Sequence, residues 1–303
     1  MGSGKWTSNA FYSYSTDKNY HTATAASQIY QQQHMSPLLN PKGVVRESRD
    51  SADNPESNAI IIGLDVTGSM SSVLLDLAKH GLNAIVTGIY DRKPVTDPHV
   101  LCMAVGDAEW DSAPLQVTQF EADIRIAQQL ELLYLEQGGG GNHYESYILP
   151  WFFAAQQTKI DCFEKRGKKG YLFTIGDEEP TPKLSRHLIQ AITGISSSHD
   201  YSAHQLLTLV SQQWEVFHVI IGQGSYATSA PKAVKEKWAA LLGQKAIWLD
   251  DYTKLAQVIV STMQAWEGVS HDAIVASWDT TTGAVVGAAV AHIHRGIAIG
   301  GVL

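Results

Sequence analysis

The sequence has little of several features that would assign it to a particular class of protein. It contains only two cysteines, Cys102 and Cys162, and their spacing matches neither a zinc site nor a disulfide framework. Two isolated thiols are typical of a reducing compartment. Residues 1–16 contain no apolar run that could act as a secretory signal. Together these absences lead us to expect a cytoplasmic protein.

Positive charge and long apolar runs are also scarce. The chain has 22 Lys and Arg against 30 Asp and Glu, a formal net charge of −8. An acidic chain gains little from attraction to phosphates, so we expect no nucleic acid as a main partner. The most apolar stretch, 284–303, is interrupted by His292, His294 and Arg295. We therefore expect no membrane-spanning segment.

The 303 residues suit one domain core of about 200 residues with extensions at both ends. Residues 1–57 are rich in Ser, Tyr, Gln and Asn and show no sustained periodicity beyond a possible helix over 25–33. This N-terminal arm is either a solvated segment that wraps its own domain or a neighbour, or a partner-binding segment that folds on contact. We place the central domain at 58–267. A C-terminal extension over 268–303 would be an extra strand or helix at the edge of the sheet, or a tail for dimerisation or a partner.

Between the extensions, short β-branched runs alternate with helix-period segments. The expected strands are 59–65, 99–105, 170–175, 216–221 and 246–249, with a short edge strand at 115–118. The expected helices include 73–89, 120–135, 144–157, 184–192, 203–212, 233–242 and 255–266. This alternation predicts an α/β fold: a doubly wound, mostly parallel, Rossmann-like sheet flanked by helices. Right-handed crossovers then bring the carboxyl ends of the strands to one edge, where ligands of such sheets bind.

Three polar clusters follow strands that should end at that edge. The first holds Asp65, Thr67 and Ser69, the second is the glycine-rich run 138–145 with Asn142 and Glu145, and the third holds Asp177. Hard divalent cations such as Mg²⁺ take oxygen ligands of these kinds. The spacing therefore predicts one cation site built from several loops.

These residues also carry a family resemblance. Asp65-x-Thr67-x-Ser69 within IIIGLDVTGSMSS resembles the metal-ion-dependent adhesion site of von Willebrand factor A domains, and Asp177 in FTIGDEEP matches that family's later aspartate. The run 138–145 is similar to the Gly-Gly-Gly-Asp-x-Pro-Glu loop of one branch of the family. Here Asn142 stands in place of Asp and Tyr144 in place of Pro.

The resemblance covers about residues 58–267, and it implies a function. It implies one Mg²⁺, with Mn²⁺ or Ca²⁺ able to substitute, bound directly by the hydroxyls and the second loop and through water by the aspartates. An acidic side chain of a protein partner would complete the shell, without turnover of a substrate. Intracellular bacterial and phage members of the family often work beside a MoxR-type AAA+ ATPase, which makes such a partner an expectation here.

Several other interpretations remain open from the sequence. Ser69 could cap the following helix, and Asp177 could begin a turn. Asp65 also resembles the aspartate nucleophile of haloacid-dehalogenase phosphatases, although Thr67 stands where their general acid would be. The chain could instead be an assembly subunit that forms homo-oligomers through its terminal arms. Finally, one acidic residue of the arm could complete the cation shell in the same or a neighbouring molecule: Glu47, Asp50, Asp53 or Glu56.

Overall fold

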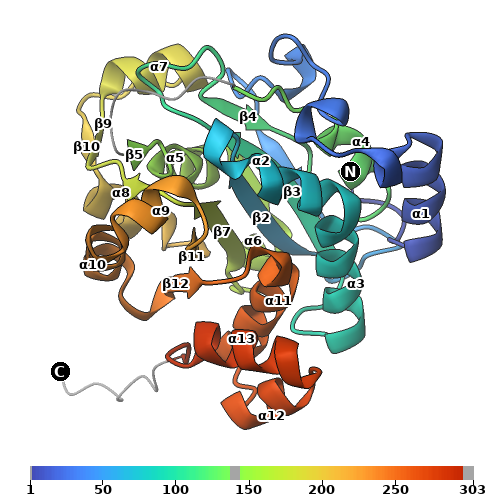
Figure 1. Ribbon diagram of the computed structural model, residues 1–303. Helices are drawn as coiled ribbons and strands as arrows, with labels where there is room; N and C mark the ends of the chain where they lie inside the picture. Colours follow the sequence, from blue (N-terminus) through green and yellow to red (C-terminus); the bar gives the residue numbers. More distant parts are fainter. Residues whose placement is uncertain (1, 137–143, 296–303) are drawn as a thin grey trace.

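A six-stranded sheet lies between two layers of helices in the computed structural model, which describes residues 2–136 and 144–295 (Figure 1). The strand order is β12-β11-β7-β2-β3-β4. Every neighbouring pair is parallel except β3 and β4. The strands are β2 (Asn58–Asp65), β3 (Pro98–Val105), β4 (Leu115–Val117), β7 (Gly170–Gly176), β11 (Trp214–Ile221) and β12 (Ala246–Leu249). The expected α/β architecture, with a mostly parallel central sheet flanked by helices, is confirmed.

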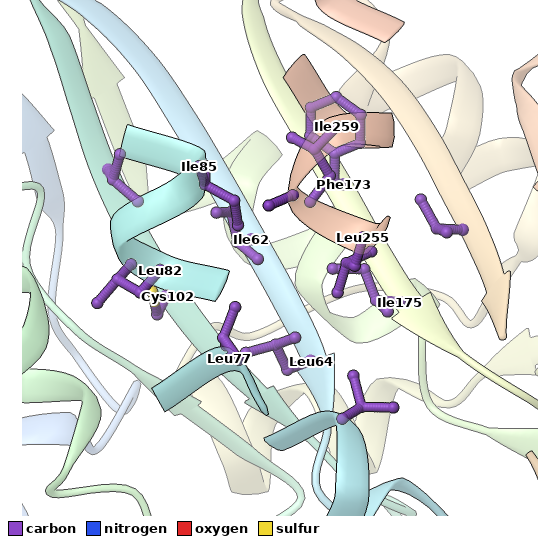
Figure 2. Close-up of a cluster of buried hydrophobic side chains, with 14 of the residues drawn as sticks. Ile62, Leu64, Leu77, Leu82, Ile85, Cys102, Phe173, Ile175, Leu255 and Ile259 are labelled. Carbon is purple, nitrogen blue, oxygen red and sulfur yellow. The ribbon is translucent and has the colours of Figure 1, made fainter. Parts of the chain in front are cut away.

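The central strand β2 shows why this layering forms. All eight of its residues are buried, and its side chains alternate between the two faces of the sheet. Ile60, Ile62 and Leu64 join one hydrophobic cluster, whereas Ala59 and Ile61 join the other. Figure 2 shows Ile62 and Leu64 of the first cluster among side chains from β3, β7 and the covering helices. A strand that is apolar on both faces is stable only between two layers.

Each face has its own set of helices. The first cluster is covered chiefly by α2 (Ser71–Asp76), α3 (Leu82–Arg92), α4 (Arg125–Leu130) and α11 (Leu255–Trp266). The second is covered by α5 (Ile148–Gln156), α6 (Asp161–Glu164), α7 (Arg186–Thr193), α8 (Ala203–Val210) and α10 (Pro231–Leu242), with α9 (Ser225–Ser229) beside them. Three short pairs complete the strands: β1 (Arg46–Ser48) with β6 (Thr158–Ile160), β5 (Tyr144–Glu145) with β8 (Glu179–Pro180), and β9 (Lys183–Leu184) with β10 (Tyr201–Ser202).

The N-terminal arm packs on its own domain. Its apolar side chains Trp6, Phe11, Tyr20 and Tyr30 are buried in the first cluster. The expected helix over 25–33 is wrong, because only a 3-10 turn forms there, at Ala26–Gln28. The arm's helix is α1 (Ser8–Asp17), which is capped by the Thr7 hydroxyl accepting from the Ala10 amide at 3.2 Å.

Two further helix predictions differ from the structure. Within the expected helix 120–135, α4 covers only Arg125–Leu130, because the Glu121 backbone pairs with Val100 of β3 instead. Within 144–157, Tyr144 and Glu145 form β5, and the helix begins at Ile148. Hydrogen bonds to distant strands outweigh local helical periodicity at both places.

The C-terminal extension is helical over its described length. Helices α12 (His271–Ala276) and α13 (Thr280–Val290) pack on α11, and α13 also contacts the edge strand β12. No helix within the described ranges is long and apolar enough to cross a membrane. Cys102 and Cys162 are both buried free thiols.

Candidate metal centre

The candidate centre lies where β2 and β7 run side by side and end at the same edge of the sheet. The chain leaves β2 toward β3 on one side, while β7 lies on its other side. Ligands of open parallel sheets bind in the crevice that forms at such a reversal of strand order. Asp65 is the last residue of β2, and Asp177 directly follows β7. Both aspartates are 0% exposed.

The loop after β2 joins the two aspartates through two hydroxyl groups. Asp65 Oδ1 accepts from the Thr67 amide at 2.9 Å and from Thr67 Oγ1 at 2.5 Å. Ser69 Oγ donates to Asp177 Oδ1 at 2.8 Å. The two hydroxyl oxygens are 3.5 Å apart. Because each hydroxyl can give its hydrogen to a carboxylate, the lone pairs of both oxygens are available to one shared ligand.

The position of Ser69 in its turn shows whether this residue caps the following helix. Ser69 lies within the 3-10 turn Gly68–Met70, and the N-cap of α2 is Met70, which has no side-chain cap. Capping by Ser69 is therefore wrong.

Asp177 is held by a second loop as well. Its Oδ2 accepts from the Tyr226 amide at 3.0 Å. A Cβ on Gly224 would lie 2.2 Å from Asp177 Cβ, so only glycine lets the loop after β11 come this close. Asp177 thus links β7, the loop after β2 and the loop after β11, which is more than the start of a turn requires.

Glu145 enters the site through the short strand β5. Its register with β8, Glu145 opposite Pro180, places it beside the segment that follows Asp177. The residue is only 2% exposed, and its Oε2 has no hydrogen-bond partner within the described residues. Burial, and then the nearby charges of Asp65 and Glu178, raise the pKa of Glu145 to about 10. Asn142, the other expected ligand of this loop, lies outside the described residues.

Glu178 belongs to the third polar cluster of the sequence but was not among the expected ligands. Its Oε2 is buried and has no hydrogen-bond partner in the described chain. Burial and the charges of Asp65 and Asp177 raise its pKa to about 8. Burial also raises the pKa of Asp65, to about 6, although Thr67 and Tyr147 donate to its carboxylate. In the sequence, the position of Glu178 next to Asp177 was the signal that could have identified it.

Tyr147 was also missed. Its hydroxyl donates to Asp65 Oδ2 at 2.7 Å, and the residue is 0% exposed. In the sequence it lies within the expected helix 144–157. Nothing in its local pattern indicated a contact with Asp65.

The acidic residues of the arm lie at the opposite edge of the sheet. Asp50 accepts from Ser57, which directly precedes β2, and Asp53 accepts from the Gly4 amide. The seven steps from Asn58 to Asp65 span about 23 Å in a strand. Completion of the cation shell by the arm of the same molecule is therefore wrong.

The donor set fits a hard cation. Neighbouring ligands in an octahedron are about 3.0 Å apart around Mg²⁺ and about 3.4 Å apart around Ca²⁺. The 3.5 Å between the two hydroxyls is closer to the second value. Within 2–136 and 144–295, His, Cys, Asp and Glu alone form no group of three or more that could hold a metal. A site here would therefore depend on Thr67 and Ser69, with an acid such as Glu145 supplying a charged oxygen.

Comparison with known proteins adds the following. No family model and no curated protein matches the sequence. The chain is similar in structure to the pilus adhesin SpaC from Lactobacillus rhamnosus GG in its open conformation, with 10% identity and a TM-score of 0.48 over 74% of this chain and 31% of the adhesin. A second structure of that adhesin gives 11% identity and a TM-score of 0.44 over 74% and 32%. The chain thus spans about a third of the adhesin.

Proposed function

We propose that this chain is a binding module of the von Willebrand factor A type, which holds one divalent cation at the carboxyl ends of β2 and β7 and uses it to bind a protein partner. Mg²⁺ is the expected ion, with Mn²⁺ or Ca²⁺ able to substitute. Thr67, Ser69 and Glu145 would supply oxygen ligands, and Asp65 and Asp177 would hold the hydroxyls and bound water. The remaining position would take a carboxylate of the partner.

One observation carries the proposal: the hydroxyls of Thr67 and Ser69 each have a carboxylate acceptor and lie 3.5 Å apart. A hydroxyl that gives its hydrogen to an aspartate turns its lone pairs elsewhere, and two such oxygens at this separation suit one cation. The unpartnered Oε2 atoms of Glu145 and Glu178 add support, because a buried carboxyl oxygen without a partner is costly.

The same contacts favour binding over phosphate hydrolysis. Hydrolysis through an aspartate nucleophile needs an acid two residues further on, and that position is Thr67. Asp65 Oδ1 accepts twice from Thr67, and Oδ2 accepts from Tyr147. A nucleophile with both oxygens engaged in this way is poorly placed to attack a phosphate. We therefore propose no catalytic residue.

A thermal melt in Mg²⁺ or Mn²⁺ and in EDTA tests this function, with wild type beside Asp65→Ala. A ligand at 100 times its Kd adds about 2.7 kcal/mol to stability. That raises the melting temperature by a few degrees in a chain of this size. We expect the shift in wild type and not in the variant.

The matched control is Asp272→Ala, which removes a carboxylate whose side chain is fully exposed far from the site. It should keep the full shift. Equal shifts in wild type and Asp65→Ala, or none in wild type at millimolar Mn²⁺, would refute the proposal.

A further inference from the structure

The Tyr147 side chain reaches the Asp65 carboxylate from outside the loop that follows β2. It precedes α5, and its hydroxyl donates to Asp65 Oδ2 at 2.7 Å. The tyrosine hydroxyl is a donor at neutral pH, and the residue is 0% exposed. Both oxygens of Asp65 are thereby fixed, Oδ1 by Thr67 and Oδ2 by Tyr147.

The backbone of β7 is shaped to admit this hydroxyl. A Cβ on Gly176 would lie 2.0 Å from Tyr147 Oη, far inside any allowed contact. The Glu178 amide donates to the same oxygen at 3.4 Å. Tyr147 therefore connects the end of β2 with the segment after β7, the two elements that carry Asp65 and Asp177.

The ring of Tyr147 is held from behind, which fixes the direction of the hydroxyl. It lies 5.6 Å from the Trp238 ring and 4.9 Å from the His218 ring, centroid to centroid. Trp238 Nε1 in turn donates to the backbone oxygen of Glu178 at 2.9 Å. A fully buried ring with such neighbours has little freedom to turn its hydroxyl away.

We propose that Tyr147 is a positioning residue for the cation: by holding Asp65 Oδ2 it fixes Oδ1 under Thr67, and so directs the Thr67 oxygen toward the ion. This inference rests on the proposed function. Partners that orient the immediate ligands of a metal typically contribute 10- to 100-fold to its affinity. Without the hydroxyl, the Asp65 carboxylate can rotate and the Thr67 hydrogen loses its fixed acceptor.

The chain supplies a matched control in Tyr171. It is also buried, on β7, and its hydroxyl donates to a carboxylate, Glu267 Oε1, at 2.5 Å. Tyr171 lies at the start of its strand, whereas Asp177 follows the end. Tyr171→Phe thus removes the same type of hydrogen bond far from the cation.

The experiment is a calorimetric titration of the full chain with Mn²⁺, using wild type, Tyr147→Phe, Tyr171→Phe and Asp65→Asn, with melts in EDTA to compare folding. We expect Tyr147→Phe to raise the Kd for Mn²⁺ about tenfold and Tyr171→Phe to leave it within twofold of wild type. Gly176→Ala, whose methyl group would displace the hydroxyl, should weaken Mn²⁺ binding in the same direction and gives an independent variant.

Three results would overturn the inference. If Tyr147→Phe and Gly176→Ala bind Mn²⁺ like wild type while Asp65→Asn does not bind, the positioning role is wrong and the proposed function stands. If Tyr171→Phe weakens binding as much as Tyr147→Phe, the effect is a general loss of rigidity. If wild type binds no Mn²⁺, the proposed function and the inference fail together.

Discussion

The two edges of the central sheet differ in the partners of their buried and half-buried acidic side chains. At the amino edge, Asp161 accepts from Arg49 Nη1 at 2.7 Å and pairs with Lys165 Nζ at 2.7 Å, and Arg166 donates to Asp50 at 2.8 Å. Burial alone would raise the pKa values of Asp50 and Asp161, but these cationic partners lower both. Both of these acids are compensated by cationic side chains of the protein itself.

At the carboxyl edge the acids of the candidate site have no such partner, although the neighbouring Glu179 pairs with Lys237. Within the described residues, no Lys or Arg forms an ion pair with Asp65, Glu145, Asp177 or Glu178. Burial and mutual repulsion raise the pKa values of Asp65, Glu145 and Glu178 to about 6, 10 and 8. The acids at the amino edge are compensated within the protein, whereas the uncompensated acids of the carboxyl edge are the pattern expected of the proposed cation site.

The largest expected effect is a difference in folding stability between two variants, each of which replaces one acid, at opposite edges of the sheet, with its neutral amide. Asp161→Asn neutralises a carboxylate whose side chain is 4% exposed and which accepts from two cations, so it should lower stability by about 2 kcal/mol. Glu145→Gln should change cation-free stability by less than about 1 kcal/mol at pH 7, because the raised pKa of Glu145 already keeps it protonated. Urea unfolding in EDTA measures both.

The thermal shift that Mn²⁺ produces should show the opposite order: it should fall more in the Glu145 variant than in the Asp161 variant. Asp161→Asn should keep the thermal shift in Mn²⁺, while Glu145→Gln should lose most of it, because a ligand carboxyl must ionise to bind the ion. Equal loss of stability at both edges would contradict the comparison.

A smaller expected effect is a loss of folding stability at low pH, caused by a histidine at the amino edge. His99, near the start of β3, is 0% exposed, and its Nδ1 lies 3.0 Å from Ser48 Oγ. Burial lowers its pKa from 6.5 to about 4. The unfolded chain therefore binds the proton first, so stability is full above pH 6.5 and is lost as the pH falls from 6.5 to 4.

The expected loss from His99 is about 1 kcal/mol at pH 5.5. Buried His218 has a pKa lowered in the same direction, so His99→Gln should reduce this slope and not remove it. Unfolding in urea at pH 7.5 and 5.5 measures the difference. An identical slope in the variant would show that His99 does not titrate as its burial requires.

The sequence predicted the fold better than the details of the site. Continuous apolar strands such as 59–65 can be stable only between two layers, which makes the parallel sheet predictable. Asp65, Thr67, Ser69 and Asp177 were identifiable because they follow such strands. Glu178 had only its position next to Asp177 as a signal. Tyr147 and Gly176 had none, because their contact depends on packing between β7 and the residue before α5. Similarly, the expected helix over 120–135 failed because Glu121 pairs with a strand distant in sequence.

The most direct test of the central claim is to locate the cation. Crystals grown with millimolar Mn²⁺ would give an anomalous difference map in which a bound Mn²⁺ appears as a peak. We expect one peak between Thr67 Oγ1 and Ser69 Oγ, within about 2.1–2.4 Å of both, with Glu145 turned toward it. A map with no peak there, or with Mn²⁺ only among surface acids, would contradict the account.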